Sequence, residues 1–387
     1  MPIGWAEARE TAWRAGYETR RPAAELPFDA AAGSALAAPL TAASDLPAFP
    51  TAAVDAWAVA GEGPWRITGV EALAGSVPAP MRSGEAVTIA TGAQVPEGCE
   101  ALIRLENAEV TGQTVTGPTA IEWREAGEEA KAGETLLPVG TPVSPPVIGL
   151  AAAAGHSTLP AHPRPLARLV VFGDELLTSG VSHSGRVRDS LGPMIPHMLD
   201  AAGALVAAET LGPVADTLDE HVASLRTATA EADLVCTTGG TMVGPVDHLH
   251  AALEAVGAEY VVNTVSVRPG FPMLLARTGD GRFIAGLPGN PQSAVIAVVT
   301  LVVPLLAGMR GLPLPELRSI TLAERVPGRG PDTHLALVDT VGNRLAHHGS
   351  GMLRGLAGAA GFAVVAPGDE AHAGRRVPLA TVPGALS

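Results

Sequence analysis

The sequence predicts a multidomain α/β protein: a central, mostly parallel α/β sandwich, an inserted β-rich domain and a small C-terminal β-domain. At 387 residues the chain has room for about two or three domains. Its 47% hydrophobic residues can fill more than one core, and 45 glycines and 34 prolines without a collagen period indicate many turns. Between residues 167 and 312, strand-like and helix-like segments alternate, which is typical of a parallel sheet covered on both faces.

The segments on either side of this alternation predict the other domains. Residues 1–45 and 139–166 combine Ala-rich helical stretches with proline-rich connectors, so we expect one N-terminal helical and linker domain. Residues 46–138 contain short β-prone pieces between Gly and Pro turns, which predicts the β-rich insertion. Residues 313–387 return to short β segments and predict the C-terminal β-domain.

The central part, residues 167–312, is expected to hold the α/β core. Strands are predicted at 168–172, 204–210, 232–238 and 283–287, and helices at 191–202, 217–229, 247–256 and 293–309. The last helix contains the apolar run 294–309, which includes Pro304 and is shorter than the roughly 20 residues that span a bilayer. We therefore expect a buried helix and no membrane partner.

Composition excludes several classes of function. Lys and Arg number 25 against 39 Asp and Glu, a net charge of -14, and no basic run is present, so we expect no nucleic-acid partner. Cys99 and Cys236 are far apart and form neither a disulfide framework nor a CxxC site. Residues 1–17 carry acids where a signal peptide needs an apolar stretch, so a reducing, cytoplasmic location is expected.

One loop that follows a predicted strand favours an anion. In an open α/β sheet, ligands bind beyond the carboxyl ends of the strands. Gly239 and Gly240 follow the strand 232–238, and glycines let backbone N–H groups approach an anion. Asp247 is placed to cap the next helix or to help hold a metal. An ordinary βα turn is the competing interpretation.

Two further loops carry rigid or acidic residues. Pro288 and Pro291 enclose the loop after the strand 283–287 and preset its shape, although a purely structural turn has the same signature. Asp174 and Glu175 end the strand 168–172, where a solvated turn is the alternative to a catalytic role.

The histidine pairs give weaker signals. His248 and His250 are two residues apart, so on a helix their side chains point in different directions and a metal pair is not expected. His347 and His348 are expected to form a solvated turn.

Taken together, the segments GDEL, GGTMVGPVD, VRPGFP and LPGNPQSA, in this order and spacing, resemble the MoeA family, the molybdopterin molybdenumtransferases of molybdenum-cofactor synthesis. Earlier segments agree: AVDAWAV resembles the family's MDGYAV, TGAQVP its TGAxxP, and REAGEE its RxxGED. The resemblance extends over nearly the whole chain. It implies that the α/β sandwich is of the molybdopterin-binding type.

The resemblance also implies site residues and substrates. The implied catalytic residues are Asp55, Glu175, Asp216 and Asp247, and the implied substrate-binding residues, besides the two glycines, are Thr91, Glu129, Arg268, Pro288 and Pro291. Asp247 and Glu175 would hold Mg²⁺, a cation that prefers carboxylate and phosphate oxygens. Adenylylated molybdopterin would receive molybdate and release AMP, with Arg268 neutralising phosphate or molybdate. The implied partners are a second copy of the chain, whose β-rich segment closes the cleft, and a molybdopterin adenylyltransferase.

Several positions depart from the family pattern. Phe271 and Thr264 stand where the family has lysines, Leu191 ends the segment that reads RDSN in the family, and FPTAAVDAW replaces DNSAMDGY. Two missing cations should weaken the binding of anions. The alternative hypothesis is therefore a catalytically impaired paralogue that binds molybdopterin or a partner protein. A third hypothesis, an adenylyltransferase, is disfavoured by the extra β-rich segments.

Overall fold

The structure is a computed structural model that describes residues 2–242 and 247–385. The chain forms two compact units: unit 1 comprises Met1–Ala37, Gly140–Val143 and Pro160–Ser387, and unit 2 comprises Ala38–Val139 and Ser144–Leu159. Each unit is described by itself. The finer division into four domains stays a prediction.

The centre of unit 1 is a seven-stranded sheet in the order β17-β14-β19-β23-β22-β20, with β18 also paired to β14. Its strands are β14 (Leu166–Phe172), β17 (Leu205–Val206), β18 (Leu211–Val214), β19 (Leu234–Thr238), β20 (Glu259–Asn263), β22 (Leu274–Arg277) and β23 (Phe283–Leu287). The pairs that join β14, β17, β18, β19 and β23 are parallel, as the alternating pattern predicts. The predicted strand 204–210 is instead divided between β17 and the approach to β18, and the antiparallel strands β20 and β22 were not predicted.

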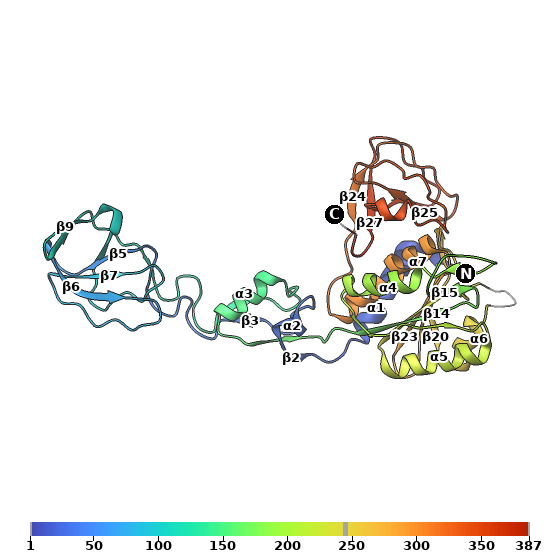
Figure 1. Ribbon diagram of the computed structural model, residues 1–387, viewed down its shortest axis with the longest axis horizontal. Coiled ribbons are helices and arrows are strands. Elements are labelled where there is room, and N and C mark those ends of the chain that lie inside the picture. Colours follow the sequence, from blue (N-terminus) through green and yellow to red (C-terminus); the bar gives the residue numbers. More distant parts are fainter. Residues whose placement is uncertain (1, 243–246, 386–387) are drawn as a thin grey trace. The chain divides into compact units, whose positions relative to one another are not determined.

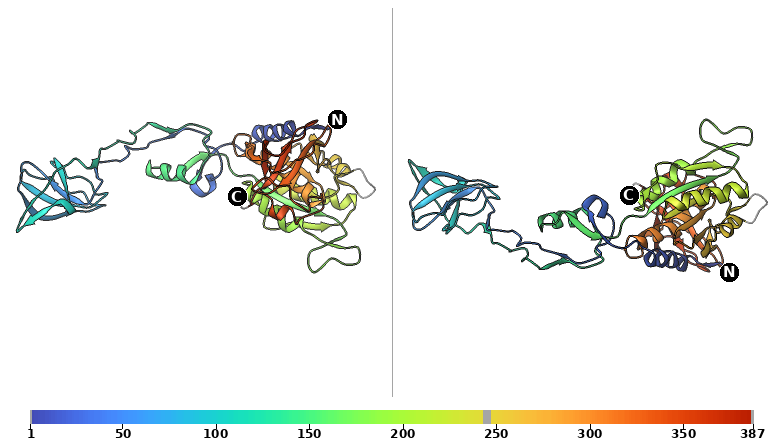
Figure 2. Two further views of the ribbon diagram at one scale, coloured as in Figure 1. Left: turned by 90° about the horizontal axis from the view of Figure 1, so that it is seen from above. Right: turned by 90° about the horizontal axis from the view of Figure 1, so that it is seen from below.

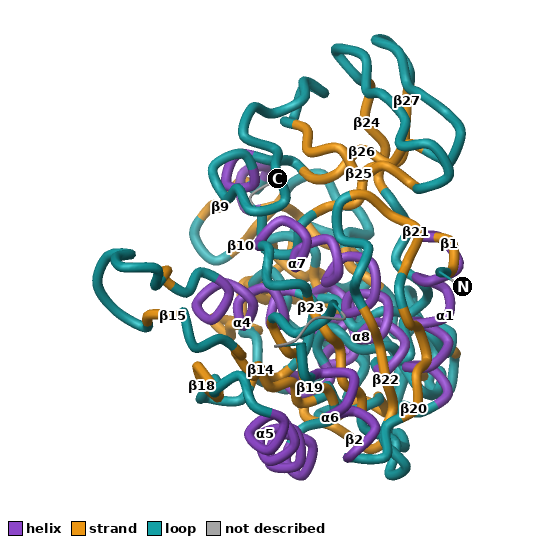
Figure 3. The backbone as a smooth tube through the Cα atoms, turned by 90° about the vertical axis from the view of Figure 1, so that its right-hand side faces the viewer, coloured by secondary structure: helices purple, strands orange, loops and turns teal. Residues whose placement is uncertain are grey.

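Helices cover both faces of this sheet. Figures 1 and 3 show α5 and α6 on one face and α1, α4, α7 and α8 on the other. Their bounds are α1 (Trp5–Glu18), α4 (Leu191–Ala201), α5 (Leu218–Glu231), α6 (Leu249–Ala255), α7 (Pro291–Ala297) and α8 (Val303–Met309), the last two joined by the π-helical turn η2 (Val298–Val302). Side chains of β14 alternate between the two cores: Leu169 belongs to the first and Val170 to the second, as a strand buried on both faces requires.

The apolar segment Pro291–Met309 is a core helix of unit 1. By length and composition it could cross a membrane, but 94% of its apolar window is buried inside the structure. This confirms the predicted buried helix. Two glycines allow α1 to pack closely against it: a Cβ on Gly16 would lie 2.3 Å from the Leu305 carbonyl oxygen, and one on Gly308 would lie 2.2 Å from that of Trp13. Figure 2 shows the blue α1 beside the orange helix in both views.

The C-terminal β-region shares a sheet with the α/β core. The order is β1-β21-β25-β26-β27-β24. The strands are β1 (Ile3–Gly4), β21 (Val265–Arg268), β24 (Arg318–Thr321), β25 (Thr333–Val338), β26 (Gly361–Val365) and β27 (Arg376–Thr381). Because β21 pairs in parallel with β25, Arg268 lies opposite His334. Shorter elements of unit 1 are β2 (Ala24–Pro27), α2 (Phe28–Ala31), β15 (Leu176–Leu177), β16 (Val187–Arg188) and η3 (Leu356–Gly358), and β13 (Thr158–Ala161) runs from unit 2 into unit 1.

Unit 2 is built on a six-stranded sheet in the order β8-β5-β7-β6-β10-β9. Its elements are β3 (Leu40–Thr41), β4 (Thr51–Ala52), β5 (Ala56–Val59), β6 (Trp65–Ala72), β7 (Glu85–Ile89), β8 (Ala101–Arg104), η1 (Leu105–Asn107), β9 (Glu109–Thr111), β10 (Thr114–Thr116), β11 (Trp123–Arg124), β12 (Thr135–Leu137) and α3 (Pro145–Ala153). The β-rich character is therefore confirmed. The strand β5, which directly follows Asp55, was not predicted.

Candidate functional site

The first part of the site is formed where parallel strands of unit 1 end side by side. The loops after β18 and β14 are tied together: the Asp216 carboxylate accepts the backbone N–H of Asp174 at 3.2 Å, and the N–H of Gly173 donates to the Val214 carbonyl at 3.1 Å. Glu175, the next residue, is exposed. The structure thus brings together two of the predicted carboxylates, because the carboxyl ends of parallel strands meet at one edge.

The glycine turn after β19 lies at the same edge. Gly239 and Gly240 have φ of 86° and 64°, a conformation that favours glycine. The Gly239 N–H donates to the Leu287 carbonyl at 3.0 Å, and a Cβ on Gly289 would lie 3.7 Å from the Gly239 Cα. The turn therefore contacts the loop after β23, which begins with the buried Pro288.

We call the residues of these loops the acidic edge and include in it Asp247, which follows the glycine turn in sequence: Glu175, Asp216, Gly239, Gly240 and Asp247. Asp247 is half-buried and precedes α6. Residues 243–246 of the predicted GGTMVGPVD loop lie outside the described residues.

A histidine that the sequence analysis missed lies beneath the glycine turn. The His221 side chain is fully buried and stacks on Phe172, with ring centroids 3.7 Å apart. Its Nδ1 lies 2.9 Å from the Thr217 carbonyl oxygen, which makes Nδ1 the donor, and Nε2 is buried with no hydrogen-bond partner among the described residues. A Cβ on Gly240 would lie 3.7 Å from that Nε2. Burial lowers the pKa of His221, so the ring is neutral near pH 7.

The neighbouring histidines turn to different partners. The His248 ring meets the edge of His221, with centroids 5.6 Å apart, whereas His250 Nδ1 lies 2.6 Å from the Tyr260 hydroxyl oxygen. The two therefore do not face a common point.

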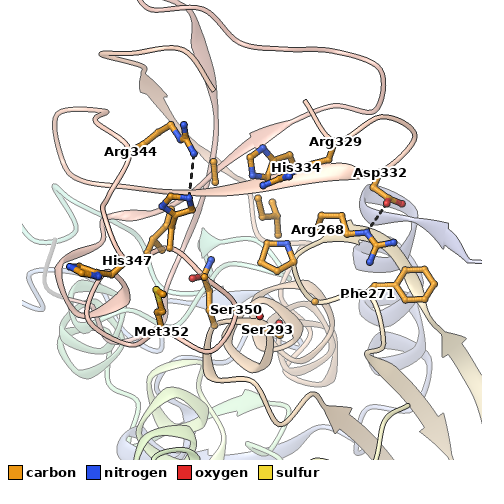
Figure 4. A pocket seen from close by; sticks show the side chains of 18 of the residues that line it. Arg268, Phe271, Ser293, Arg329, Asp332, His334, Arg344, His347, Ser350 and Met352 are labelled. Carbon is orange, nitrogen blue, oxygen red and sulfur yellow. Dashed lines mark hydrogen bonds and ion pairs between the residues drawn. The ribbon is translucent and has the colours of Figure 1, made fainter. Parts of the chain in front are cut away.

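The second part of the site is a pocket of about 1010 Å³ in unit 1, between the α/β core and the C-terminal β-region (Figure 4). Its charged lining is mainly positive, and we call it the cationic pocket. Three arginines and three histidines line it, together with one carboxylate: Arg268, Arg329, Arg344, His334, His347, His348 and Asp332. Gln292 and Ser293 at the start of α7 and Ser350 also contribute.

Arg268 is held from two sides. Its Nε donates to the Asp332 carboxylate at 2.9 Å, and its guanidinium lies 4.9 Å from the centroid of the Phe271 ring (Figure 4). Phe271 stands where the family pattern has a lysine. Its ring supports the guanidinium of Arg268 through a cation–π contact.

The histidines of the pocket have defined hydrogen bonds. His334 Nδ1 lies 2.6 Å from the Pro327 carbonyl oxygen. His348 Nδ1 lies 3.0 Å from the Leu345 carbonyl oxygen, and its Nε2 lies 3.5 Å from Arg344 Nη2, which can only donate. His347 and His348 are exposed, but they also line the pocket, so the expectation of a mere solvated turn is incomplete.

The loop after β23 reaches both parts of unit 1. Pro288 and Gly289 lie at the acidic edge, Pro291 is the first residue of α7, and the Gln292 N–H donates to the Ser350 carbonyl at 2.9 Å in the cationic pocket. Fixed φ at the two prolines suits a loop that has to keep two neighbours in place.

The predicted residues of unit 2 fall into two places. Asp55 accepts both the backbone N–H of Thr91 at 2.7 Å and its hydroxyl at 2.9 Å. These bonds, the backbone one first, lower the pKa of Asp55 and keep it ionised. Glu129 is exposed on another stretch, where its N–H donates to the Leu46 carbonyl at 2.9 Å.

Comparison with known proteins finds similarity along most of the chain. Residues 3–155 match the family model for the MoeA N-terminal region (domain I and II), and residues 168–308 match that for a probable molybdopterin binding domain. The molybdopterin molybdenumtransferase of Bacillus subtilis is 31% identical over 290 residues, which cover 70% of this chain and 67% of the relative. The chain belongs to the MoeA family.

Other relatives extend this result. A molybdopterin molybdenumtransferase of Staphylococcus aureus (strain Mu50) is 32% identical over 64% of this chain, which spans 60% of that relative's length. A crystal structure of a molybdopterin biosynthesis MoeA protein from Pyrococcus horikoshii has a TM-score of 0.76 at 22% identity, covering 100% of both chains, and shows that the fold is the same.

The departures from the MoeA pattern have local explanations. Thr264 has a positive φ of 64° between β20 and β21, and its hydroxyl donates to the Asn263 carbonyl at 2.6 Å. Leu191 is buried in the core at the start of α4, while Asp189 accepts its N–H at 2.9 Å. Both side chains thus serve local structure.

The acidic edge suits a metal shared with a substrate. Among the described residues, no group of three His, Cys, Asp or Glu side chains could hold a metal alone. Mg²⁺, however, needs only one or two protein carboxylates when phosphate oxygens supply the other ligands. Glu175 and Asp247 carry carboxylates, the ligand type that Mg²⁺ prefers, and their role in holding this ion stays a prediction.

Proposed function

We propose that the protein inserts molybdate into adenylylated molybdopterin with release of AMP. The observation that carries this proposal is the pairing of two chemically opposite regions in unit 1. The acidic edge offers carboxylates and a glycine turn, and the cationic pocket offers three arginines. The loop of residues 288–293 contacts both. A reaction that cleaves the pyrophosphate of one substrate to release AMP and takes up an oxyanion as the other substrate needs both kinds of surface.

At the acidic edge, the glycine turn would bind phosphate through backbone N–H groups. Glu175 and Asp247 would hold Mg²⁺, which when bound stabilises negative charge on the leaving phosphate. Asp216 holds the neighbouring loop in place through the N–H of Asp174.

In the cationic pocket, the arginines would bind molybdate through charge-assisted hydrogen bonds. Asp332 and Phe271 orient Arg268, because one accepts its Nε–H and the other supports its guanidinium plane. Ser293 and Ser350 add hydroxyl groups to the lining.

We further propose a cytoplasmic homodimer in which the second copy's unit 2 supplies Asp55, Thr91 and Glu129. The two bonds from Thr91 leave Asp55 charged and oriented, as a residue that accepts a substrate proton or hydrogen bond has to be. A molybdopterin adenylyltransferase would supply the substrate.

The test is AMP release from adenylylated molybdopterin with Mg²⁺ and molybdate, together with complementation of a strain that lacks the molybdenumtransferase. We expect turnover and rescue. The positions of Thr264 and Phe271 favour a second candidate, a paralogue that binds molybdopterin without turnover. Binding without AMP release and without rescue would establish that candidate instead.

A further inference from the structure

His334 is the most buried of the three histidines that line the cationic pocket, at 5% exposure. It lies on β25, directly opposite Arg268 on β21. A carbonyl oxygen can only accept, so the 2.6 Å contact with Pro327 makes Nδ1 the donor. In the neutral ring, Nε2 then carries a lone pair and no proton, so it would repel an anion.

The charged groups around His334 come from every element that surrounds the pocket. Arg329 precedes β25, Arg344 and His348 follow it, Asp332 lies two residues before His334, and Arg268 comes from β21. Burial lowers the pKa of His334 most. The hydrogen bond to the Pro327 carbonyl raises it, and the charges of Arg329, Arg344 and His348 lower it further. His334 is therefore neutral near pH 7 in the free protein.

We propose that His334 takes up one proton from solvent when a doubly charged oxyanion binds in the cationic pocket, so that Nε2–H donates to a ligand oxygen. A dianion among the arginines reverses the local field and favours the protonated ring. An N–H bond forms at Nε2 as hydronium or a buffer acid in solvent gives up the proton; no other covalent bond forms or breaks. The proposal rests on the proposed function for the identity of the oxyanion as molybdate.

His348 is poorly suited to this role. Its Nε2 already accepts from Arg344, its Nδ1 contacts the Leu345 carbonyl, and the side chain is exposed. A proton on its Nε2 would break the contact with Arg344. His347 also lines the pocket, but it is exposed, so solvent screens its charge more than that of the buried His334. We therefore assign the coupling to His334.

Proton uptake makes the affinity for the oxyanion depend on pH. Between the pKa of the free protein and that of the complex, affinity falls by about tenfold for each unit rise in pH. A monoanion compensates less of the positive field, so the same residue favours dianions over monoanions.

Titration calorimetry of the full-length protein with molybdate tests the proposal. Buffers of different ionisation enthalpy give the number of protons bound, and we expect about one per oxyanion near pH 7.5. Sulfate, which stays doubly charged across this range, should give the same count, whereas phosphate changes its own charge and should give a different one. H334Q should bind molybdate with no proton uptake and little pH dependence, and H334R should bind it tightly at every pH.

The control is H372Q, which removes an exposed histidine of the C-terminal β-region and should leave proton uptake unchanged. Molybdate binding by the wild type without proton uptake, uptake that survives in H334Q, or a lack of binding by any oxyanion would each overturn the proposal. Molybdate binding with proton uptake but without AMP release would support it and would contradict the proposed transferase activity instead.

Discussion

The acidic edge and the cationic pocket of unit 1 are built in different ways. The acidic edge is formed by residues in the loops that follow parallel strands, and the contacts between these loops are largely made by backbone groups. The cationic pocket collects side chains from separated segments, among them residues 268–272, 328–337 and 344–352. The end of a single strand is enough to position a backbone N–H group. The cluster of cations forms only because β21 pairs with β25 in one sheet.

The two regions also differ in charge, and this difference has a chemical use. Carboxylates repel a free oxyanion but attract a divalent cation, while arginines do the reverse. Under the proposed function, keeping them apart in one unit would let each bind its own ligand.

The largest effect is expected for Asp247→Ala at the acidic edge. Loss of a carboxylate that would hold Mg²⁺ should abolish Mg²⁺-dependent AMP release, while the free energy of unfolding changes by about 1 kcal/mol because the side chain packs little. A Mg²⁺ titration of turnover and a thermal melt measure both. Glu254→Ala, an exposed carboxylate on α6, is the matched control. Wild-type Mg²⁺ dependence in the Asp247 variant would remove this residue from the metal site.

Arg268→Ala should weaken molybdate binding in the cationic pocket by about ten- to a hundredfold, the effect of one charge-assisted contact. Binding of phosphate at the acidic edge should not change. Equilibrium binding of molybdate and of AMP separates the two regions. Arg226→Ala, an exposed arginine on α5, should leave both affinities as they are; equal losses for molybdate and AMP would mean that the two regions are not separate.

Phe271→Lys should not strengthen molybdate binding, although it restores a cation at that position. The substitution removes the ring that supports Arg268 and places a like charge beside it, so we expect an affinity that is unchanged or up to about fivefold lower. Phe271→Leu should show a loss of similar size. A clear gain for Phe271→Lys alone would indicate that the missing cation limits this protein and would favour the impaired paralogue.

The smallest effect concerns acid stability. Burial lowers the pKa of His221 in the folded state, so the unfolded chain takes up the proton more readily. The contribution of His221 to the free energy of unfolding is therefore fully present above the usual histidine pKa of about 6.5. It is lost as the pH drops below that value, by at most about 1.4 kcal/mol per pH unit for one histidine. Urea unfolding at two pH values should show a smaller acid loss for His221→Leu than for the wild type. An equal loss in both proteins would assign the acid sensitivity to other groups.

The sequence predicts the acidic edge better than the cationic pocket, because the two regions are built in different ways. The parallel strands and their loops were predictable, because apolar runs, glycines and prolines occur together locally, and β23 and the helix that follows it were found at their positions. The resemblance also placed Asp55 and Thr91, which the structure joins by two hydrogen bonds.

The rest depended on long-range pairing. No local pattern links Arg268 to Arg329 and Arg344, so the pocket could not be predicted. The antiparallel strands β20 and β22 were missed because their short segments lack a strong period. His221 could have been noticed: it stands at the spacing of Leu225 and Ala228 on the buried face of α5, where a polar ring is unusual.

The place where the chain leaves unit 1 has an evolutionary consequence. The N–H of Ala37, the last residue before unit 2, donates at 2.8 Å to the carbonyl of Pro160, the residue at which the chain finally returns. Exit and return are thus neighbours, and α1, which precedes the exit, is already packed against α8. An ancestral gene for the α/β unit could acquire or exchange the β-rich insertion at this point without disturbing its own core, since insertions are tolerated where the flanking residues are close together.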